Sequence, residues 1–496
     1  MNLSKSRYCD YIYCPKHCWL NIHKPEECKI DTSAQQRMED GHKVGELAKG
    51  LFGDFCDVTV EGEDGHLDIP AMIVKTQELI KAGAETICEA AFSADGCYCA
   101  VDIMHKEKGG YAIYEVKSTT KEKAEYEYDV AYQKFVLERC KIKITGTYLV
   151  NINNRYVRSG EIERDKFFKI TDYASRIAEH EKYIAENCEQ AKAILDNTNE
   201  PVVSLQYGCD TCDFWSYCSK DIPKPSVLDL GGIFKKKITK WNLYDDGIKT
   251  FQDVLNSDVN LSDKQKRQIE YAINDWGTYA DKIALRKYLS ELFYPLYFLD
   301  FETTAPAIPE FDGTRPYQAI PFQYSLHFAE SENGEIKHRE FLGEPEIDPR
   351  RALAEQLCKD IPQNVCTLAY HASVERGIVQ KLAEEFADLS EHLYNIAENI
   401  KDLETPFNKG WYYNRAMGKW SSIKVVLPAI YPDDSELDYH NLEGVHNGSE
   451  AMTVYPAMKD MEPGERARTR QQLLEYCKLD TYAMVKLWKE LVMVCK

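Results

Sequence analysis

The strongest constraint on the fold is a block of strand-like segments between residues 86 and 152. These segments are rich in Val, Ile, Tyr and Cys, and glycine or polar turns separate them. The turn Lys108-Gly109-Gly110 predicts that two of them pair as a hairpin. A helix-patterned stretch follows the hairpin, so the chain is expected to have an α/β fold. The expected strands are Thr86–Phe92, Cys97–His105, Ala112–Val116 and Lys143–Ile152, and the expected helix is Lys121–Cys140.

Length and composition set broad limits on the class of protein. A chain of 496 residues is long enough for several domains. The net charge of −20 argues against a generally basic nucleic-acid coat, although a local basic groove would still bind phosphate. The sequence shows neither a signal peptide nor a long apolar run, so a cytoplasmic protein without a membrane span is expected. The 17 cysteines therefore predict free thiols or metal ligands rather than a disulfide scaffold.

Changes in composition predict three parts of the chain. Proline residues bracket a cysteine cluster and end at Ile222-Pro223-Lys224-Pro225, which is typical of a domain edge. Residues 223–292 contain short amphipathic patterns and are expected to form a small helical bridge. The apolar segment Leu296–Phe301 opens a further α/β domain. The expected domains are therefore 1–222, 223–292 and 293–496. Single long helices are expected at Asp172–Asp196 and Gln471–Val494.

Asp102, Glu115 and Lys117 form the first candidate site. Glu115 and Lys117 are two residues apart on a strand, so their side chains share one face. If the hairpin forms, Asp102 lies beside Glu115. Two carboxylates can hold Mg²⁺ or Mn²⁺, which polarises a phosphate and activates water, and the lysine offsets the developing charge. Glu-x-Lys alone is a common pattern, and an ordinary surface ion pair is the alternative reading.

Cysteines provide a second candidate site. Cys209-x2-Cys212-x5-Cys218 supplies three soft ligands on a short segment. The fourth ligand is expected from the N-terminus, where Cys14 is the best candidate and Cys9 and Cys18 are rivals. Four cysteines suit structural zinc as well as an iron–sulfur cluster, and the spacing alone slightly favours zinc, the commoner structural metal.

A further acidic set, the second site, lies in the C-terminal part. Asp300 and Glu302 share a face at the end of an apolar strand, where two acids repel each other without a cation. Tyr476 and Asp480 are four residues apart on the last helix and therefore share a face. Asp480 would complete a carboxylate cage, and the Tyr476 hydroxyl would position water. Ser422 and Lys424 are candidate phosphate contacts, and simple loop packing is the alternative.

The N-terminal motifs resemble the PD-(D/E)XK nucleases of the RecB type. The motifs are Gly41-His42-Lys43-Val44-Gly45-Glu46, Val101-Asp102-Ile103, Glu115-Val116-Lys117-Ser118 and Tyr132-Gln133. The resemblance implies that Gln133 supports the site. Many members carry a histidine at the position of Gly45, so here Glu46 is the candidate metal ligand on the first helix. One cysteine before that helix and three after the last helix resemble the iron–sulfur subgroup. This implies a [4Fe–4S] cluster on Cys14, Cys209, Cys212 and Cys218.

The C-terminal motifs resemble the DEDD exonucleases of the ribonuclease H-like fold, in the variant with a tyrosine in the last motif. Asp300-Phe301-Glu302 and Tyr476-x3-Asp480 match the outer motifs. Glu375 stands where the middle motif usually has an aspartate. Pro321–His327, Ser422–Pro428 and Asn447–Ala451 resemble an uncharacterised bacterial family that fuses both domains.

These resemblances together imply a metal-dependent nuclease with two centres, acting on single strands or ends of DNA in preference to RNA. A role in DNA repair or phage defence is implied by the resemblance alone. Two alternatives are left open. In the first, only one centre is active and the other binds nucleic acid. In the second, the chain is a non-enzymatic iron–sulfur protein that binds nucleic acid or protein partners.

Overall fold

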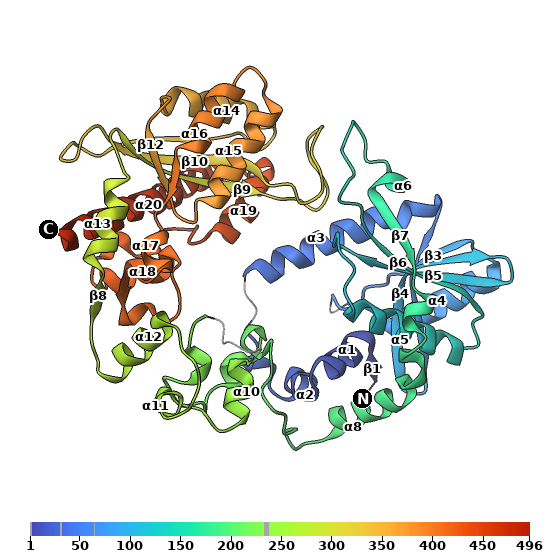
Figure 1. Ribbon diagram of the computed structural model, residues 1–496. Helices are drawn as coiled ribbons and strands as arrows, with labels where there is room; N and C mark the ends of the chain where they lie inside the picture. Colours follow the sequence, from blue (N-terminus) through green and yellow to red (C-terminus); the bar gives the residue numbers. More distant parts are fainter. Residues whose placement is uncertain (1, 30–31, 64, 233–237) are drawn as a thin grey trace. The chain divides into compact units, whose positions relative to one another are not determined.

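The computed structural model describes residues 2–29, 32–63, 65–232 and 238–496 (Figure 1). The chain divides into two compact units. The first unit comprises Met1–Lys220 together with Pro306–Gln318, and the second comprises Asp221–Ala305 and Ala319–Lys496. Both combine helices with a β-sheet, so the expected α/β class is confirmed at this level.

The first unit is built on a mixed seven-stranded sheet of order β2-β3-β4-β5-β6-β7, with β1 beside β4. The expected hairpin is present, because β4 and β5 pair antiparallel from Glu107↔Gly110 to Ile103↔Tyr114. The parallel pairing of β5 with β6 requires a crossover, which α5 provides. The strands are β1 (Leu3–Ser4), β2 (Cys56–Asp57), β3 (Thr86–Ala94), β4 (Cys97–Glu107), β5 (Gly110–Lys117), β6 (Ile144–Ile152) and β7 (Phe168–Asp172).

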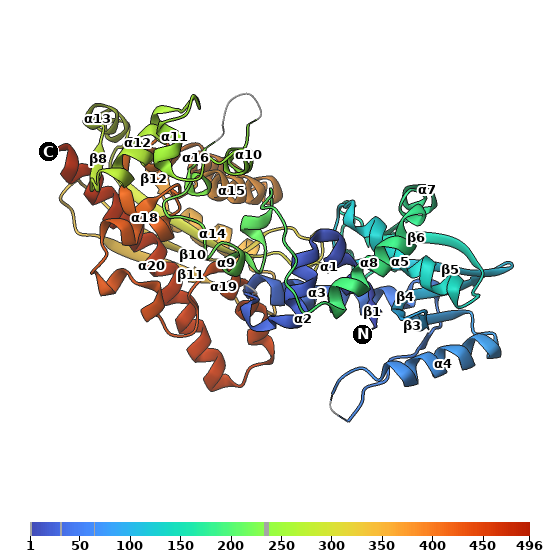
Figure 2. The same ribbon diagram turned by 90° about the horizontal axis from the view of Figure 1, so that it is seen from below.

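Helices cover both faces of this sheet. Helices α1, α5 and α8 share one hydrophobic core with β3–β5, whereas Val44 and Ala48 of α3 belong to a second core on Ile103 and Val150. Helix α4 lies alongside β3 (Figure 2). The helices are α1 (Lys5–Tyr13), α2 (Pro15–His23), α3 (Thr32–Lys49), α4 (Ile69–Ala82), α5 (Glu125–Arg139), α6 (Arg164–Phe167), α7 (Ala174–Ile177), α8 (Ile184–Asp196) and α9 (Trp215–Cys218).

One helix prediction in this unit is wrong. Residues 172–196 do not form a single helix, because Asp172 pairs with Tyr148 as the last residue of β7. Its carboxylate then accepts a hydrogen bond from the backbone of Ala174, and α7, a 3-10 turn (His180–Lys182) and α8 follow. The polar composition of this stretch predicted one helix, but it did not reveal that Asp172 belongs to strand β7.

The second unit contains a five-stranded sheet of order β11-β10-β9-β12-β13. Strands β9, β10 and β11 are antiparallel neighbours, whereas β12 and β13 run parallel to β9. A two-stranded sheet of β8 and β14 accompanies it. The strands are β8 (Thr278–Ala280), β9 (Leu296–Thr304), β10 (Ile320–Ala329), β11 (Lys337–Leu342), β12 (Cys366–Ala369), β13 (Ile400–Asp402) and β14 (Tyr412–Asn414).

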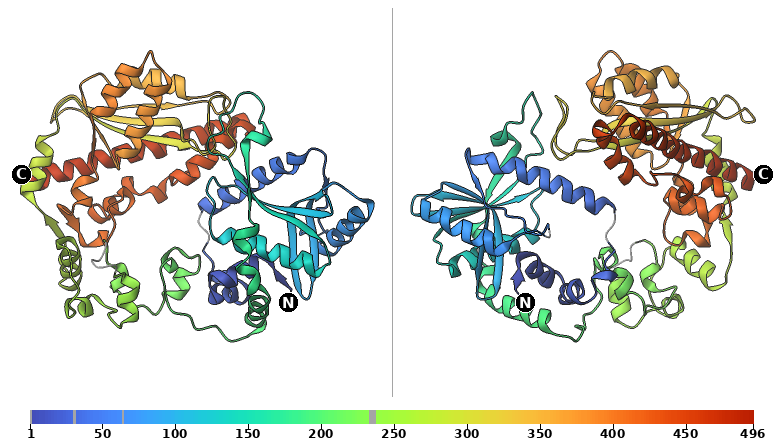
Figure 3. Two further views of the ribbon diagram at one scale, coloured as in Figure 1. Left: turned by 45° about the vertical axis from the view of Figure 1, so that its right-hand side comes forward. Right: turned by 180° about the vertical axis from the view of Figure 1, so that it is seen from behind.

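The two faces of this sheet carry different helices (Figure 3). Tyr297, Leu299 and Phe301 of β9 share a core with α14–α16, whereas Leu296 and Phe298 share one with α18 and α20. Asp300 and Glu302 alternate with the first set and therefore face α20. The helices are α10 (Lys240–Asp245), α11 (Phe251–Leu255), α12 (Asp263–Ile273), α13 (Lys282–Ser290), α14 (Arg350–Asp360), α15 (Ser373–Glu385), α16 (Ser390–Glu398), α17 (Thr405–Asn408), α18 (Ile423–Ile430), α19 (Gly448–Ala457) and α20 (Pro463–Cys495).

The segment 223–292, expected to be a separate bridge, belongs to the second unit. It supplies α10–α13 and also β8, which pairs with β14 through Tyr412↔Ala280. Among the described residues, no helix has both the length and the apolar character needed to cross a membrane.

Candidate active sites

The first site lies where β4 and β5 separate. Their pairing ends at Ile103↔Tyr114, and Asp102 and Glu115 are the next residues on the two strands. The predicted juxtaposition of these two acids is therefore present. The backbone N–H of Val116 donates to Asp102 at 2.7 Å, which fixes one oxygen of that carboxylate.

Glu115 is the most strongly compensated acid of this site. Its side chain is 3% exposed and accepts hydrogen bonds from Lys5 Nζ at 2.8 and 3.0 Å. Lys117 Nζ lies 2.8 Å from Glu115, and the Gln133 amide also donates to it. Burial opposes ionisation, but Lys117 and Lys5 hold the pKa of Glu115 well below its usual range. Glu115 is therefore an anion at neutral pH.

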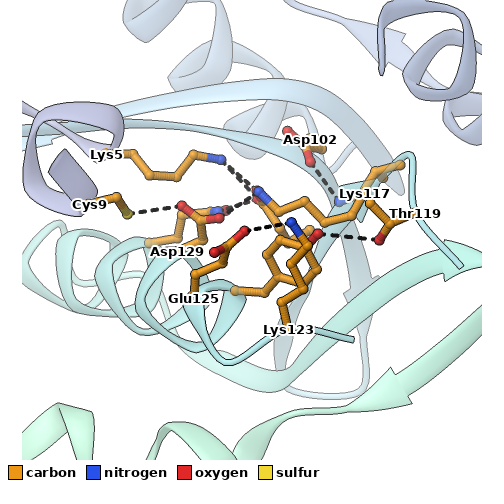
Figure 4. Close-up of polar contacts among 12 residues, drawn as sticks. Lys5, Cys9, Asp102, Lys117, Thr119, Lys123, Glu125 and Asp129 are labelled. Atoms are coloured by element: carbon orange, nitrogen blue, oxygen red, sulfur yellow. Dashed lines mark hydrogen bonds and ion pairs between the residues drawn. The ribbon is translucent and has the colours of Figure 1, made fainter. Parts of the chain in front are cut away.

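Lys117 and Lys5 remain cations. Figure 4 shows both side chains converging on the same point and Lys117 reaching Asp129, at 2.5 Å. Burial alone would lower the pKa of Lys117, but Glu115 and Asp129 raise it. Lys5 behaves in the same way through Glu115 and Asp102. Sequence reasoning missed Lys5 and Asp129. Lys5 lies 110 residues from its partner, and no motif marks it.

Asp102 differs from Glu115 in its electrostatic surroundings. Burial and the neighbouring Glu115 raise the pKa of Asp102 to about 7. Without a metal ion, this carboxyl therefore keeps its proton to a higher pH than an ordinary aspartate. A divalent cation beside it would favour the carboxylate, so the residue is suited to metal binding.

A cavity of about 180 Å³ next to Asp102 brings two further acids to this site. One is Glu46 of α3, the expected ligand, whose carboxylate is paired with Lys49. The other is Glu89 of β3, which sequence reasoning missed. Glu89 has φ +56°, and the register on its two sides is continuous, because Cys88 pairs with Ile103 and Ala90 with Val101. Glu89 therefore lies opposite Asp102, and both residues line the cavity.

The four predicted cysteine ligands line one cavity of about 360 Å³, together with residues such as Leu20 and Phe214. The rivals have other partners: the Cys9 thiol donates to Asp129, and the Cys18 thiol to the carbonyl of Arg7. Burial raises the pKa of the Cys209, Cys212 and Cys218 thiols, which a bound metal would reverse. The four cysteines that line this cavity are Cys14, Cys209, Cys212 and Cys218.

The spacing of these sulfurs bears on the kind of metal. Tetrahedral zinc, with bonds of about 2.3 Å, brings its sulfurs to about 3.8 Å from one another. Among the described residues, one group of possible metal ligands has its ligand atoms all within 4.8 Å of one another. This group consists of Asp300, Glu302 and Cys477. The four cysteines do not form such a group.

The second site is assembled on β9 and α20. Asp300 and Glu302 face Tyr476, Cys477 and Asp480 on one side of that helix. The Cys477 sulfur lies 3.9 Å from an Asp300 carboxylate oxygen, so this thiol, not foreseen from the sequence, joins the two acids. Burial, followed by the charge of Asp480, raises the pKa of Asp300 well above its usual range and that of Glu302 to about 8.

Two further side chains contact this site from outside the sheet. The Tyr439 hydroxyl donates to Asp480 at 2.6 Å, and Lys424 Nζ donates to the Tyr476 hydroxyl at 3.2 Å. Both residues also line a cavity of about 880 Å³. A Cβ on Gly448, at the start of α19, would come within 3.6 Å of Glu302, so this helix N-terminus closely approaches the carboxylate.

Glu375 stands near the acids of the second site, as the middle motif predicts. It contributes to the raised pKa of Asp300 and Glu302, and burial raises its own pKa to about 7. One of its carboxylate oxygens is buried without a hydrogen-bond partner among the described residues. An unsatisfied buried oxygen of this kind is what a cation would complete.

Comparison with known proteins gives one match. Residues 297–421 match a family described as a domain of unknown function (DUF2779). This stretch includes Asp300, Glu302 and Glu375 but not α20. No curated protein matches the chain.

Proposed function

We propose that this chain is a metal-dependent nuclease that hydrolyses phosphodiester bonds of DNA, with one centre in each unit. The observation that carries the proposal is the first site. Asp102 and Glu115 face each other where two strands separate, and Lys117 is ion-paired to Glu115. Buried acids beside buried lysines are costly to fold and are expected where charge chemistry occurs.

The two units support specific fold assignments within this proposal. In the first unit, the mixed sheet, its crossover helix with Gln133 and the helix α3 with Glu46 are expected of a PD-(D/E)XK domain. In the second unit, three antiparallel strands followed by two parallel ones favour a ribonuclease H-like domain. The acids of the second site lie on the central strand and the last helix, as the DEDD resemblance implies.

The donor sets of both sites fit Mg²⁺ or Mn²⁺. In the first site, Asp102 and Glu115 would hold the ion, with Glu46 and Glu89 at the adjoining cavity. In the second site, Asp300, Glu302, Glu375 and Asp480 would hold it. A bound divalent ion supplies positive charge that polarises the phosphate and acidifies water. The raised pKa values of Asp102, Glu302 and Glu375 support a missing positive charge at both places.

The protein groups have separable roles in this mechanism. Lys117 is a cation whose pKa is raised, so it stabilises negative charge on the phosphate rather than taking up a proton. Gln133 and Lys5 orient the Glu115 carboxylate. In the second site, the Tyr476 hydroxyl positions water, and Lys424 orients that hydroxyl and offsets charge.

Cleavage assays with Mg²⁺ or Mn²⁺ on single-stranded and duplex DNA test the proposal. Lys117→Ala and Asp300→Ala are each expected to remove part of the activity, and the double variant all of it. If only one single variant loses activity, the other site is a binding platform. A double variant that cleaves like the unmodified chain contradicts the proposal. RNA substrates in the same assay test the preference for DNA.

We also infer a [4Fe–4S] cluster on Cys14, Cys209, Cys212 and Cys218, which would join the N-terminus of the first unit to its last helix. The cavity that all four cysteines line supports a shared metal site, and the family resemblance favours an iron–sulfur cluster over zinc. Anaerobically purified protein is expected to show a broad visible absorbance that bleaches on reduction. Colourless protein containing stoichiometric zinc would contradict it. With nucleic acid as the substrate and free thiols throughout, a cytoplasmic location is proposed.

A further inference from the structure

The first unit contains a segment from a distant part of the chain. Pro306–Gln318 connects β9 to β10, yet it packs within the first unit. Arg158 is its main anchor. The backbone N–H of Arg158 donates to Thr314 at 3.0 Å, and its guanidinium donates to the carbonyl of Pro309 at 2.7 Å. The backbone N–H of Gly313 donates back to Arg158 at 2.9 Å.

Apolar packing fixes the same segment. Ala307 is buried in the hydrophobic core that contains Val44 and Ala48 of α3. Asp312 accepts a hydrogen bond from the backbone of Gly160 at 2.8 Å. Backbone hydrogen bonds, a carboxylate and a buried side chain therefore act together, and this segment is an integral part of the first unit rather than a loose connection.

Tyr317, near the end of the segment, reaches the first site. Its hydroxyl donates to the carbonyl of Ser118, and its backbone N–H donates to Pro306 at 2.9 Å, which closes the segment into a loop. Tyr317 has φ +57°, a conformation that is uncommon for a bulky residue. Burial, followed by the charge of Asp40, raises the pKa of Tyr317 to about 12, so the hydroxyl keeps its proton and acts as a donor.

Ser118 is the residue directly after Lys117, in the turn that ends β5. The N–H of Thr119 donates to the carbonyl of Lys117 at 2.8 Å, which makes this turn tight. Helix α3 contacts the turn as well, because a Cβ on Gly41 would lie 3.7 Å from the Ser118 hydroxyl. The turn that carries Lys117 is thus held by α3 and by Tyr317.

We propose that Tyr317 is a positioning residue of the first site, which sets the place of Lys117 through its hydrogen bond to the Ser118 carbonyl. The inference rests on the proposed nuclease function. Under this inference, the first site depends on a segment that begins nearly 190 residues after Lys117 in the sequence. That segment follows β9, the strand that carries Asp300 and Glu302. Tyr317 touches the backbone of the site rather than its carboxylates.

Steady-state cleavage by the full chain with Asp300→Ala, which isolates the first site, tests this role. Tyr317→Phe removes the hydroxyl and keeps the ring. It is expected to lower kcat about fivefold with KM unchanged, the effect of losing one hydrogen bond of ordinary strength. Tyr183→Phe, at an exposed tyrosine of the same unit, is the matched control and should leave kcat unchanged. Hydrogen exchange in the peptide containing Ser118 and Thr119 should become faster in Tyr317→Phe alone.

The possible results separate this inference from the function on which it rests. Unchanged kcat and unchanged exchange in Tyr317→Phe would overturn the positioning role. A rise in KM with unchanged kcat would also overturn it, because Tyr317 would then contact substrate. If Lys117→Ala in the same background cleaves normally, the first site is not a nuclease centre, and both the function and the inference fail.

Discussion

In the first unit, the buried Glu115 has two lysines and an amide around it, whereas in the second unit, Asp300 and Glu302 have mainly other acids as neighbours. The pKa of Glu115 is accordingly lowered, and that of Glu302 is raised to about 8. Both arrangements fit cation binding, but the buried negative charge is neutralised by different groups in the two sites. The first site carries its own cations, while the second site depends on a proton or a metal to neutralise it.

The lysines explain why the first site can keep its shape without metal. Lys5 comes from α1, Lys117 from β5 and Gln133 from α5, so three elements meet at one carboxylate. In the second site, Tyr439 and Lys424 are the described hydrogen-bonding groups at Asp480 and Tyr476. We therefore expect the metal-free protein to be well ordered around β5 and less stable around β9.

The largest expected effect is that of Glu115→Gln. Removing this charge leaves Lys5 and Lys117 buried beside a neutral group, which is expected to destabilise the first unit by about 3 kcal/mol. The matched change in the second unit, Asp300→Asn, should instead stabilise the metal-free protein, because it relieves repulsion. Hydrogen exchange of β5 and β9 peptides measures each unit separately, since a two-unit chain need not unfold in one step.

The exposed Glu125→Gln on α5 is the control for a change of charge alone. If Glu115→Gln leaves the protection of β5 unchanged, the lysines do not depend on Glu115, and the contrast between the two sites is wrong. If Asp300→Asn makes hydrogen exchange in β9 faster, the negative charge of the second site is already neutralised by protein groups without metal.

The second prediction concerns metal and pH. The pKa of Glu302 is about 8 in the folded chain against an ordinary 4.5, so metal-free folded protein retains a proton that the unfolded chain releases. Between these values, the stability of the second unit should fall as pH rises. Mn²⁺ replaces the proton, so its stabilising effect should grow with pH and reach about 2.7 kcal/mol at a hundredfold excess over Kd.

Thermal unfolding with and without Mn²⁺, at about pH 6 and about pH 8, measures this effect. The variant Asp300→Asn/Glu302→Gln is the control and should lose both the pH dependence and the response to Mn²⁺. A metal response that is larger at the lower pH would contradict the proposed protonation of these acids.

Strand alternation explains how much of the sites could be predicted. Alternation predicted that Glu115 and Lys117 share one face, and likewise Asp300 and Glu302. The Gly-Gly turn predicted that Asp102 lies beside Glu115. Alternation could not find Lys5, because that contact spans 110 residues. It did not place Glu89 at the site, because alternation does not fix the register that puts Glu89 of β3 opposite Asp102 of β4. Tyr317 lies in a turn and Tyr439 begins a three-residue 3-10 helix, so neither belongs to an element long enough to show a periodic pattern.

The third prediction concerns Glu89 and the affinity of the first site for metal. It tests whether the first site is better preorganised for metal binding than the second site. Glu89→Gln keeps the size and shape of the side chain and removes a negative charge opposite Asp102. If Glu89 supports metal binding there, the variant should weaken Mn²⁺ binding at the first site about tenfold, the usual cost of losing a supporting group. Calorimetric titration of the Asp300→Ala chain measures this affinity. Glu78→Gln on the exposed face of α4 is the control, and equal affinities in the two variants would remove Glu89 from the site.

The smallest expected effect is that of Tyr439→Phe, which probes how the second site holds its acids in place. The Tyr439 hydroxyl donates to Asp480 at 2.6 Å, and its ring lies beside that of Tyr476. Losing this hydrogen bond should cost about 1 kcal/mol, or roughly a fivefold loss of cleavage by a Lys117→Ala chain, in which the second site alone acts. Tyr394→Phe, at an exposed tyrosine of α16, should have no effect. Because acids outnumber Lys424 around the carboxylates of the second site, excess Mn²⁺ should restore most of the activity of Tyr439→Phe. Failure of Mn²⁺ to do so would mean that Tyr439 acts on the substrate instead of on Asp480.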